Sequence, residues 1–302
     1  MPEINYDHKS IANGRIPPIR KLGAVNRNGG VSPFVWNNRL MRMELIEDKS
    51  GARAGIRDCE TGEFVSFVDS GRSFYSCFAE EDAVYIACVQ QNQKDTVYIH
   101  ESHDLIHWEK RMLLQNPGWD YFNTSLTKGP DGYVIALEAR SPTIYVGKYP
   151  NTLFFATSPD LHNWTFMDYH NGYPLDRYTG IPWLHYCEGW YYLIATELLP
   201  LQRYANYIYR TKDFITWHVG FQNPILIPSS EDREISPRST EIDPSFLEEI
   251  RTRVIAGVYD IHMCNWNGKS YINYNACDLL GYYFMAEAEC ESSVEQLLAS
   301  YF

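Results

Sequence analysis

The sequence predicts an all-β fold: a single five-bladed β-propeller with four antiparallel strands in each blade. Three observations lead to this prediction. Strand-like segments separated by turn signals run along the whole chain, while helical periodicity is almost absent. A turn motif returns three times, and a hairpin pattern returns five times. Repeated units of this size are typical of propellers, in which each blade is one small sheet.

The first repeat is a turn motif that combines Ser or Thr with Asp and Trp. Its copies, SHDLIHW, SPDLHNW and TKDFITW, end at Trp108, Trp164 and Trp217. In each copy the Asp carboxylate can cap a tight turn, and the Trp can anchor the next strand in a hydrophobic layer. A β-rich segment precedes each copy and a shorter one follows it. The motif is therefore expected to join successive strands of a blade.

The second repeat is a hairpin of two apolar strands joined by a short turn. Its five copies begin near residues 31, 73, 121, 180 and 258, and the last turn contains Asn-Gly, a strong hairpin signal. We expect these hairpins to supply the first two strands of five blades. No Pro- or Gly-rich linker divides residues 1–302, so we expect one domain. A β-sandwich or two small β domains are the alternatives.

One helix is expected, over residues 243–254, in an insertion before the last blade. Asp243 is suited to cap its N-terminus, and Pro244 fits its first turn. Acidic residues precede the Arg residues in this segment, which favours a helix through its dipole.

The composition excludes several classes of partner. The 302 residues include 26 Lys and Arg against 38 Asp and Glu, a formal net charge of −12. Because phosphate backbones and anionic membranes attract basic residues, we expect neither nucleic acid nor membrane as a partner. The polar N-terminus lacks a signal peptide, and the seven cysteines show no CxxC spacing. We therefore expect a cytoplasmic protein with free thiols; nothing in the sequence sets the oligomeric state.

Candidate site residues follow from aligning the five hairpins. In a propeller the first strand of each blade lines the central channel, and the end of the second strand lies beside its start. Counting five residues from the start of each second strand gives Glu44, Gln90, Glu138, Glu197 and Ala276. The last blade offers Asp260 at the start of its first strand instead. The alternative is that these strands simply end in polar residues at the surface.

Converging carboxylates point to a particular chemistry. They repel one another, so the pKa of at least one rises toward the value that a general acid needs. Two carboxylates across an acetal are the working groups of glycoside hydrolysis. We therefore expect a carbohydrate substrate, with Tyr and Trp faces available for stacking. Further candidates for substrate binding are Asn123, Arg177, His262, Trp183, Gln90 and Arg72.

No cofactor is expected. The sequence has no Gly-rich nucleotide loop and no Cys and His cluster with zinc spacing, so no catalytic metal is expected either. A structural cation in the central channel is compatible with this architecture.

These repeats resemble the five-bladed propeller glycosidases of the glycoside hydrolase family 43 type and its relatives. The segments YFNTSLTKGPDGYVIALE, DRYTGIPWLHYCEGWYYLIATE and YDIHMCNWNGKSYINYNACDLLGYYFMAEAE carry the resemblance, which covers about residues 25–302. It implies a catalytic set of an Asp base, an Asp that modulates the pKa and a Glu acid on different blades. Glu197 and Glu138 are then the acid candidates, Asp260 is the base or modulator, and Glu44 is a reserve.

The chain departs from this pattern at two inner strands. The first has Val31-Ser32-Pro33 where the base Asp would stand, and the third has Asn123-Thr124 where family members often have Asp-Pro. The main hypothesis is a glycoside hydrolase, exo-acting and inverting, for a small oligosaccharide or glycoside. The alternatives are a catalytically inactive sugar-binding propeller, or a phosphorolytic or transferase relative with Arg72 and Arg177 holding phosphate.

Overall fold

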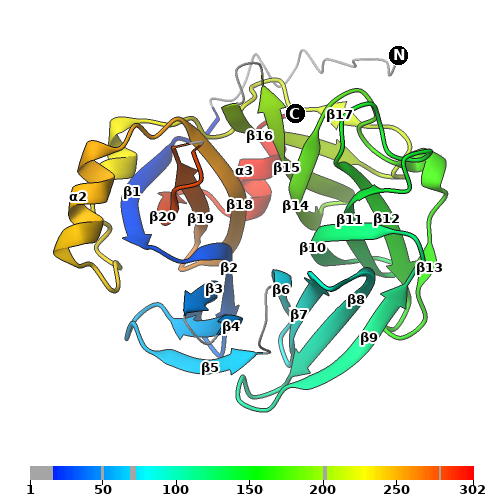
Figure 1. The fold of residues 1–302 in the computed structure, drawn as a ribbon, viewed down its shortest axis with the longest axis horizontal. Helices are drawn as coiled ribbons and strands as arrows, with labels where there is room; N and C mark the ends of the chain where they lie inside the picture. Colours follow the sequence, from blue (N-terminus) through cyan, green and yellow to red (C-terminus); the bar gives the residue numbers. More distant parts are fainter. Residues whose placement is uncertain (1–15, 49–50, 69–72, 200–202, 279) are drawn as a thin grey trace.

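The chain forms five four-stranded antiparallel sheets arranged as blades in a ring (Figure 1). The computed structural model describes residues 16–48, 51–68, 73–199, 203–278 and 280–302. The predicted five-bladed propeller is confirmed, and the β-sandwich and two-domain alternatives are wrong. Each blade begins at its innermost strand, within two residues of the predicted starts.

Blades 1 to 4 each use four consecutive strands. Blade 1 comprises β2 (Gly29–Trp36), β3 (Arg39–Asp48), β4 (Gly51–Asp58) and β5 (Phe64–Val68). Blade 2 comprises β6 (Ser73–Ala79), β7 (Val84–Gln90), β8 (Gln93–Ser102) and β9 (Glu109–Gln115). Blade 3 comprises β10 (Asp120–Gly129), β11 (Gly132–Ser141), β12 (Thr152–Ser158) and β13 (Thr165–Phe166). Blade 4 comprises β14 (Thr179–Cys187), β15 (Trp190–Leu199), β16 (Arg203–Thr211) and β17 (His218–Val219).

Blade 5 is assembled from both ends of the described chain. Its inner strands are β18 (Gly257–Trp266), β19 (Lys269–Cys277) and β20 (Tyr283–Cys290), and its outermost strand is β1 (Ile19–Asn26). In the antiparallel ladder Ala24 pairs with Ala286. The ring is therefore closed by the strand that comes first in sequence, which the hairpin pattern did not predict.

The hairpin turns have the backbone that their sequences predict. Type I′ turns need positive φ at both central residues, which favours Asn and Gly. The turns of blades 1, 4 and 5 meet this requirement at Asn37 and Asn38, at Glu188 and Gly189, and at Asn267 and Gly268.

The Asp-containing turns are also confirmed. Oδ1 of Asp213 accepts the backbone N–H groups of Ile215 and Thr216, at 2.9 and 2.8 Å. Phe214 has a φ of 58°, and its side chain is buried in the core together with Trp217. Asp104 and Asp160 make the same bonds in their turns.

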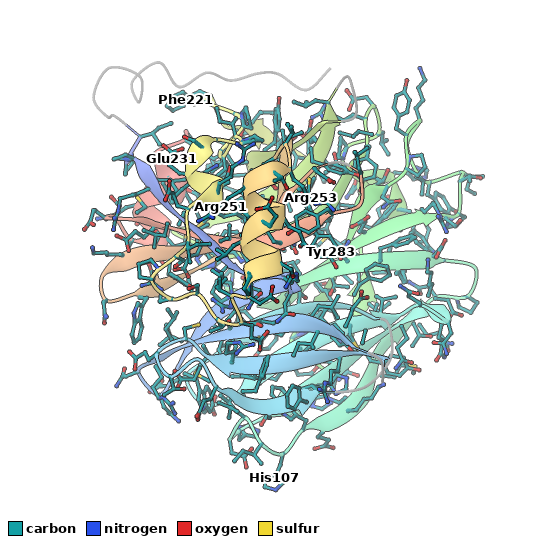
Figure 2. All side chains as sticks on the ribbon, turned by 60° about the vertical axis from the view of Figure 1, so that its left-hand side comes forward. His107, Phe221, Glu231, Arg251, Arg253 and Tyr283 are labelled. Atoms are coloured by element: carbon teal, nitrogen blue, oxygen red, sulfur yellow. The ribbon has the colours of Figure 1, made fainter. Side chains whose placement is uncertain are left out.

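The predicted helix is present as α2 (Pro244–Thr252) on the outside of blade 5 (Figure 2). Asp243 caps it by accepting the N–H of Phe246 at 2.8 Å, and the Phe246 ring packs 6.0 Å from that of Phe284 on β20. A second helix, α3 (Val294–Ala299), was not predicted, and short 3₁₀ turns span Tyr169–Asn171 and Ser230–Arg233. None of the described helices is long and apolar enough to cross a membrane.

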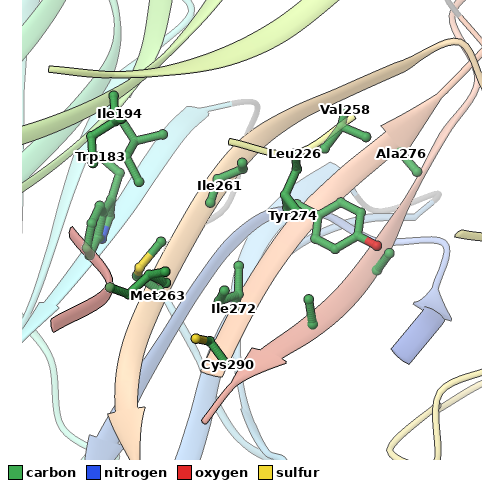
Figure 3. Packing of buried hydrophobic residues seen from close by; sticks show 14 of the residues in the cluster. Trp183, Ile194, Leu226, Val258, Ile261, Met263, Ile272, Tyr274, Ala276 and Cys290 are labelled. Carbon is green, nitrogen blue, oxygen red and sulfur yellow. The ribbon is translucent and has the colours of Figure 1, made fainter. Parts of the chain in front are cut away.

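Apolar cores fill four of the five blade interfaces. Figure 3 shows part of the core between blades 4 and 5, where Trp183 and Ile194 lie with Ile261, Met263 and Ile272. Similar clusters join blades 1 and 2, 2 and 3, and 3 and 4. All seven cysteines are free, and five of them are buried.

The interface between blades 5 and 1 is different, because buried charges occupy much of it. We call it the closing seam and define it by Arg42, Glu44, Arg57, Tyr271 and Glu287. The Arg42 guanidinium lies 2.8 Å from Glu44 and donates to Tyr271 Oη at 3.2 Å. Tyr271 in turn donates to Glu287. A small apolar cluster of Leu40, Cys59 and Tyr271 lies alongside.

Candidate active site

The mouth of the propeller is the end at which the inner strands begin and the second strands end. Near this end the innermost strands of blades 1, 3, 4 and 5 each carry a β-bulge. A bulge inserts an extra residue that bends the strand and redirects a side chain. The bulges fall at residues 30–31, 122–123, 181–182 and 260–261.

The bulges correct the predicted alignment of carboxylates. In the ladders, Glu44 and Glu138 lie opposite the bulges of blades 1 and 3, but the matching residues of blades 4 and 5 are Ala195 and Tyr274. Glu197 pairs with Thr179, two residues further along its strand. Counting from strand starts could not reveal this shift, because the bulges and the lengths of the hairpins differ between blades.

Asp260 is the carboxylate that lies in a bulge. Its φ of 59° is left-handed, a conformation that costs free energy in a non-glycine residue and that is concentrated at functional sites. Asn275 donates to its Oδ2 at 2.9 Å, and Nε2 of His262 lies 3.2 Å from its Oδ1. The side chain keeps 11% of its surface exposed, more than that of Glu44 or Glu197. Asp260 is therefore partly open to solvent.

His262 lines a cavity of about 220 Å³ inside the ring. Its Nδ1 lies 3.0 Å from Oγ of Ser32 in blade 1. The predicted sugar-binding residue Trp183 also lines this cavity, where its ring stacks on His185 at 5.2 Å. Trp183 is 8% exposed and belongs to the core between blades 4 and 5, so the structure does not support its predicted contact with substrate at the mouth.

Glu197 is buried beside a single basic group. Nε of Arg177 donates to its Oε1 at 2.9 Å, and Arg177 also pairs with Asp176 at 3.0 Å. Burial raises the pKa of Glu197, and the Arg177 guanidinium opposes this rise without cancelling it. A carboxyl with a raised pKa keeps its proton to higher pH, which suits a general acid.

Among the described residues, Glu138 has hydrogen-bond donors but no basic partner. Asn123 donates to its Oε2 at 2.7 Å, the N–H of Ile181 donates to the same oxygen at 2.7 Å, and Asn151 donates to Oε1. Burial raises the pKa of Glu138, and these three donors work against the rise. Asn123, which was predicted to bind substrate, contacts Glu138 in the structure.

Glu44 is not supported as a reserve acid. It is fully buried in the closing seam, where Arg42 and Arg57 lie 2.8 and 2.9 Å from its Oε1. Burial alone would raise its pKa, but the two guanidinium groups outweigh burial and lower it. A carboxylate held ionised between two Arg residues stabilises the fold and has no proton to give.

Gln90 and Arg72 complete the predicted set. Gln90 ends β7 and pairs with Ser73 across the ladder of blade 2, half-buried at the mouth. Arg72 lies outside the described residues.

A group of tyrosines at the mouth was missed by sequence reasoning. The Tyr204 and Tyr259 rings lie 5.8 Å apart, and those of Tyr259 and Tyr283 lie 6.4 Å apart. Burial and the nearby Asp260 raise the pKa of Tyr259 well above its usual value, and burial and Glu138 do the same for Tyr178. The available signal for Tyr259 was position, since it directly precedes Asp260 on the inner strand of blade 5.

Other features do not add a site at the mouth. A cavity of about 650 Å³ lies outside the ring, lined mainly by residues 16–21 and 221–231, and contains none of the predicted site residues. Within the described ranges, no three or more His, Cys, Asp or Glu side chains gather as they would around a metal ion.

The five blades with carboxylates and tyrosines at one end define the class: a five-bladed β-propeller that resembles glycoside hydrolases of the family 43 type. A thermostable family-43 glycoside hydrolase matches with a TM-score of 0.60 at 10% identity, over 88% of this chain and 89% of that one. BT0996, in a complex with RGII, matches with a TM-score of 0.63 at 12% identity, over 93% and 94%. The α-L-arabinofuranosidase of Podospora anserina, in complex with cellotriose, gives 0.56 at 9% identity, over 97% and 96%.

At these identities the likeness concerns the fold. No family model matches the chain, and no curated protein matches its sequence.

Proposed function

We propose that the protein is a glycoside hydrolase that cleaves a small oligosaccharide or glycoside at the mouth of the propeller. The observation that carries this proposal is Asp260, a partly open carboxylate in a left-handed bulge of an inner strand. The site also offers buried carboxyl groups on the neighbouring blades and tyrosine rings suited to stacking on a sugar. The structural neighbours support the same class, since they include a family-43 glycoside hydrolase, a complex with RGII and an α-L-arabinofuranosidase in complex with cellotriose.

In the proposed mechanism Asp260 and Glu197 have opposite roles. Glu197, whose pKa burial raises, donates its proton to the oxygen of the leaving group. Asp260, ionised and bonded by Asn275, takes a proton from water as that water attacks the anomeric carbon from the opposite face. The products are a sugar of inverted configuration and the released alcohol. Exo action is part of this proposal, as is Glu138 as the second candidate for the acid.

One observation favours a second function, sugar binding without cleavage. Among the described inner strands, Asp260 is the one carboxylate located in a bulge; blade 3 presents Asn123 there and blade 4 presents Ile181. The phosphorolytic alternative has less support. Arg177 is already paired with Glu197 and Asp176, so it is not available to hold a phosphate.

The test is hydrolysis of aryl glycosides, including arabinofuranosides, xylosides, galactosides and galactofuranosides. We expect one of them to be cleaved, and Asp260→Asn to lower kcat by about 10³-fold, since general acid–base catalysis contributes about 10²- to 10⁴-fold. Glu197→Gln and Glu138→Gln are compared on substrates with good and with poor leaving groups. The general acid is the residue whose replacement lowers kcat less when the leaving group is good, because such a group needs no proton. Asp104→Asn, in a turn after β8, is the matched control and leaves kcat unchanged.

The binding function makes a different prediction for the same proteins. Calorimetry would detect a sugar bound at micromolar affinity while no product forms over days. Cleavage that Asp260→Asn leaves intact would contradict the proposed role of Asp260.

A further inference from the structure

A chain of polar side chains crosses from blade 1 to blade 5 directly behind the mouth. Ser32 on β2 reaches Nδ1 of His262 at 3.0 Å, and Nε2 of His262 lies 3.2 Å from Oδ1 of Asp260. Asn275 donates to the other oxygen of the carboxylate at 2.9 Å. Ser32, His262 and Asn275 are buried, and the Asp260 side chain is 11% exposed, so water competes little for the contacts behind the carboxylate.

The partners at each end determine where the protons lie. The backbone N–H of Cys77 donates to Oγ of Ser32 at 3.3 Å, which leaves the Ser32 hydroxyl proton for Nδ1 of His262. At the other end, an ionised carboxylate can only accept, so Nε2 of His262 must carry hydrogen. With Nε2 as the donor to Asp260, Nδ1 of the neutral ring can accept the Ser32 hydroxyl, so the contacts at both ends fit the tautomer protonated on Nε2.

We propose that Ser32 and His262 are a positioning pair that holds Asp260 in place as the general base of the mouth. This inference rests on the proposed hydrolytic function and deepens it. With Asn275 and His262 facing its two oxygens, the Asp260 carboxyl is fixed in direction before substrate arrives. The acid role then falls to a carboxyl on another blade.

Ser, His and Asp residues also form nucleophilic catalytic sites, but the geometry excludes a nucleophilic role for Ser32. Ser32 is 1% exposed, and its oxygen already accepts the N–H of Cys77. An attacking hydroxyl has to reach the substrate, which Ser32 cannot. Its function is to orient the imidazole.

The remaining groups around His262 do not compete for this role. The cavity that it lines is also lined by His185 on β14, Cys77 on β6 and Cys264 on β18. Burial raises the pKa of both thiols far above the neutral range, so neither carries charge beside the imidazole. His185 lies 3.8 Å from Glu295 of α3 and stacks on Trp183.

The first experiment does not depend on activity. In protein labelled with ¹⁵N-histidine, the ring nitrogens of His262 are assigned by comparison with His262→Gln. We expect the wild-type protein to show the tautomer protonated on Nε2, Ser32→Ala to shift it toward a mixture of tautomers, and Ser32→Thr to retain it. A wild-type ring protonated on Nδ1, or a spectrum that Ser32→Ala leaves unchanged, would overturn the pair.

The second experiment uses a glycoside that the wild-type protein cleaves. Because the pair acts through Asp260, Ser32→Ala should lower kcat by about 10-fold with KM within about twofold. Ser32→Thr, which keeps the hydroxyl, should restore most of the loss. Equal kcat in Ser32→Ala and wild type would overturn the inference. If no glycoside is cleaved, the proposed function fails, and the tautomer measurement still decides whether the pair exists.

Discussion

At the interface between blades 3 and 4, the Glu138 carboxyl fills the space that a side chain at Gly180 would take. A Cβ atom at position 180 would lie 2.8 Å from the Glu138 carboxyl carbon, too close for any normal contact. The absence of a side chain lets the carboxyl reach the N–H of Ile181 at 2.7 Å. Position 180 is therefore glycine because Glu138 leaves no room for a side chain, and not because of the backbone conformation there.

The matching prediction is a coupling between these two residues. Gly180→Ala should destabilise the protein by about 1–3 kcal/mol, because the added methyl group displaces a buried, hydrogen-bonded carboxyl. In the Glu138→Ala background the same change should cost less, with a coupling of about 1 kcal/mol or more. Urea unfolding of the four proteins measures both quantities. Additive effects would show that Gly180 and Glu138 do not share this space.

The sequence predicted contacts between residues close together in the chain, but it did not predict the contacts between blades. The Asp213 turn was predictable because its acceptor and donors lie within three residues of each other. The contact between Ser32 and His262 joins two blades that are distant in sequence, so no local pattern contains it. Trp183 was placed with the substrate for its residue type, but packing at a blade interface governs its position.

Among the elements, the closing seam differs from the other interfaces in its chemistry. Glu44 on β3 lies between Arg42 of the same strand and Arg57 of β4, and Arg57 also reaches Glu241 at 2.8 Å. Buried ion pairs contribute little net stability when complete, but a charge left without its partner is costly. The seam therefore depends on all of its members being present.

Replacing Glu44 tests this dependence. Glu44→Gln should destabilise the protein by about 3 kcal/mol at pH 7, because two buried guanidinium groups lose the anion that they share. Since the folded state lowers the pKa of Glu44 below its usual value of 4.5, the carboxylate stabilises the fold above that pH. This contribution is lost as the pH falls through the folded pKa, so the difference between wild type and variant should narrow below about pH 4.5.

The matched control is Glu241→Gln. Its carboxylate pairs with the same Arg57 but is 56% exposed, so its loss should cost less than about 1 kcal/mol. Denaturant titrations of the three proteins at neutral and acidic pH make the comparison. A gap between Glu44→Gln and wild type that stays constant with pH would argue against an ionised Glu44 in the seam.

At the scale of the whole molecule, one strand completes the ring. β1 covers the outer edge of β20, and its residue Lys21 is bound by Asp232 at 2.7 Å in a buried ion pair. The hairpin repeats predicted five blades because each repeat is contiguous in sequence. They could not predict this closure, because the pairing of Ala24 with Ala286 joins opposite ends of the described chain.

Removing β1 should therefore open the last blade. A chain that begins at Gly29 leaves the edge of β20 and its apolar neighbours exposed, and we expect it to aggregate or to unfold without a sharp transition. Adding a peptide of residues 16–28 should restore the elution volume of the full chain and part of the cooperative transition. Size-exclusion chromatography and thermal unfolding measure both. A truncated chain that unfolds at the same temperature as the full chain would contradict this role of β1.

The pairing of β1 with β20 also determines when blade 5 can form during synthesis. Among the described strands β1 leaves the ribosome first, whereas its partner is made last, on the order of tens of seconds later at usual elongation rates. Until then the nascent chain carries an unpaired strand at one end and growing blades at the other. The first four blades can assemble as they emerge, but the fifth has to wait until β20 has emerged. In the cell, the interval before this last pairing is when the protein is most exposed to aggregation and proteolysis.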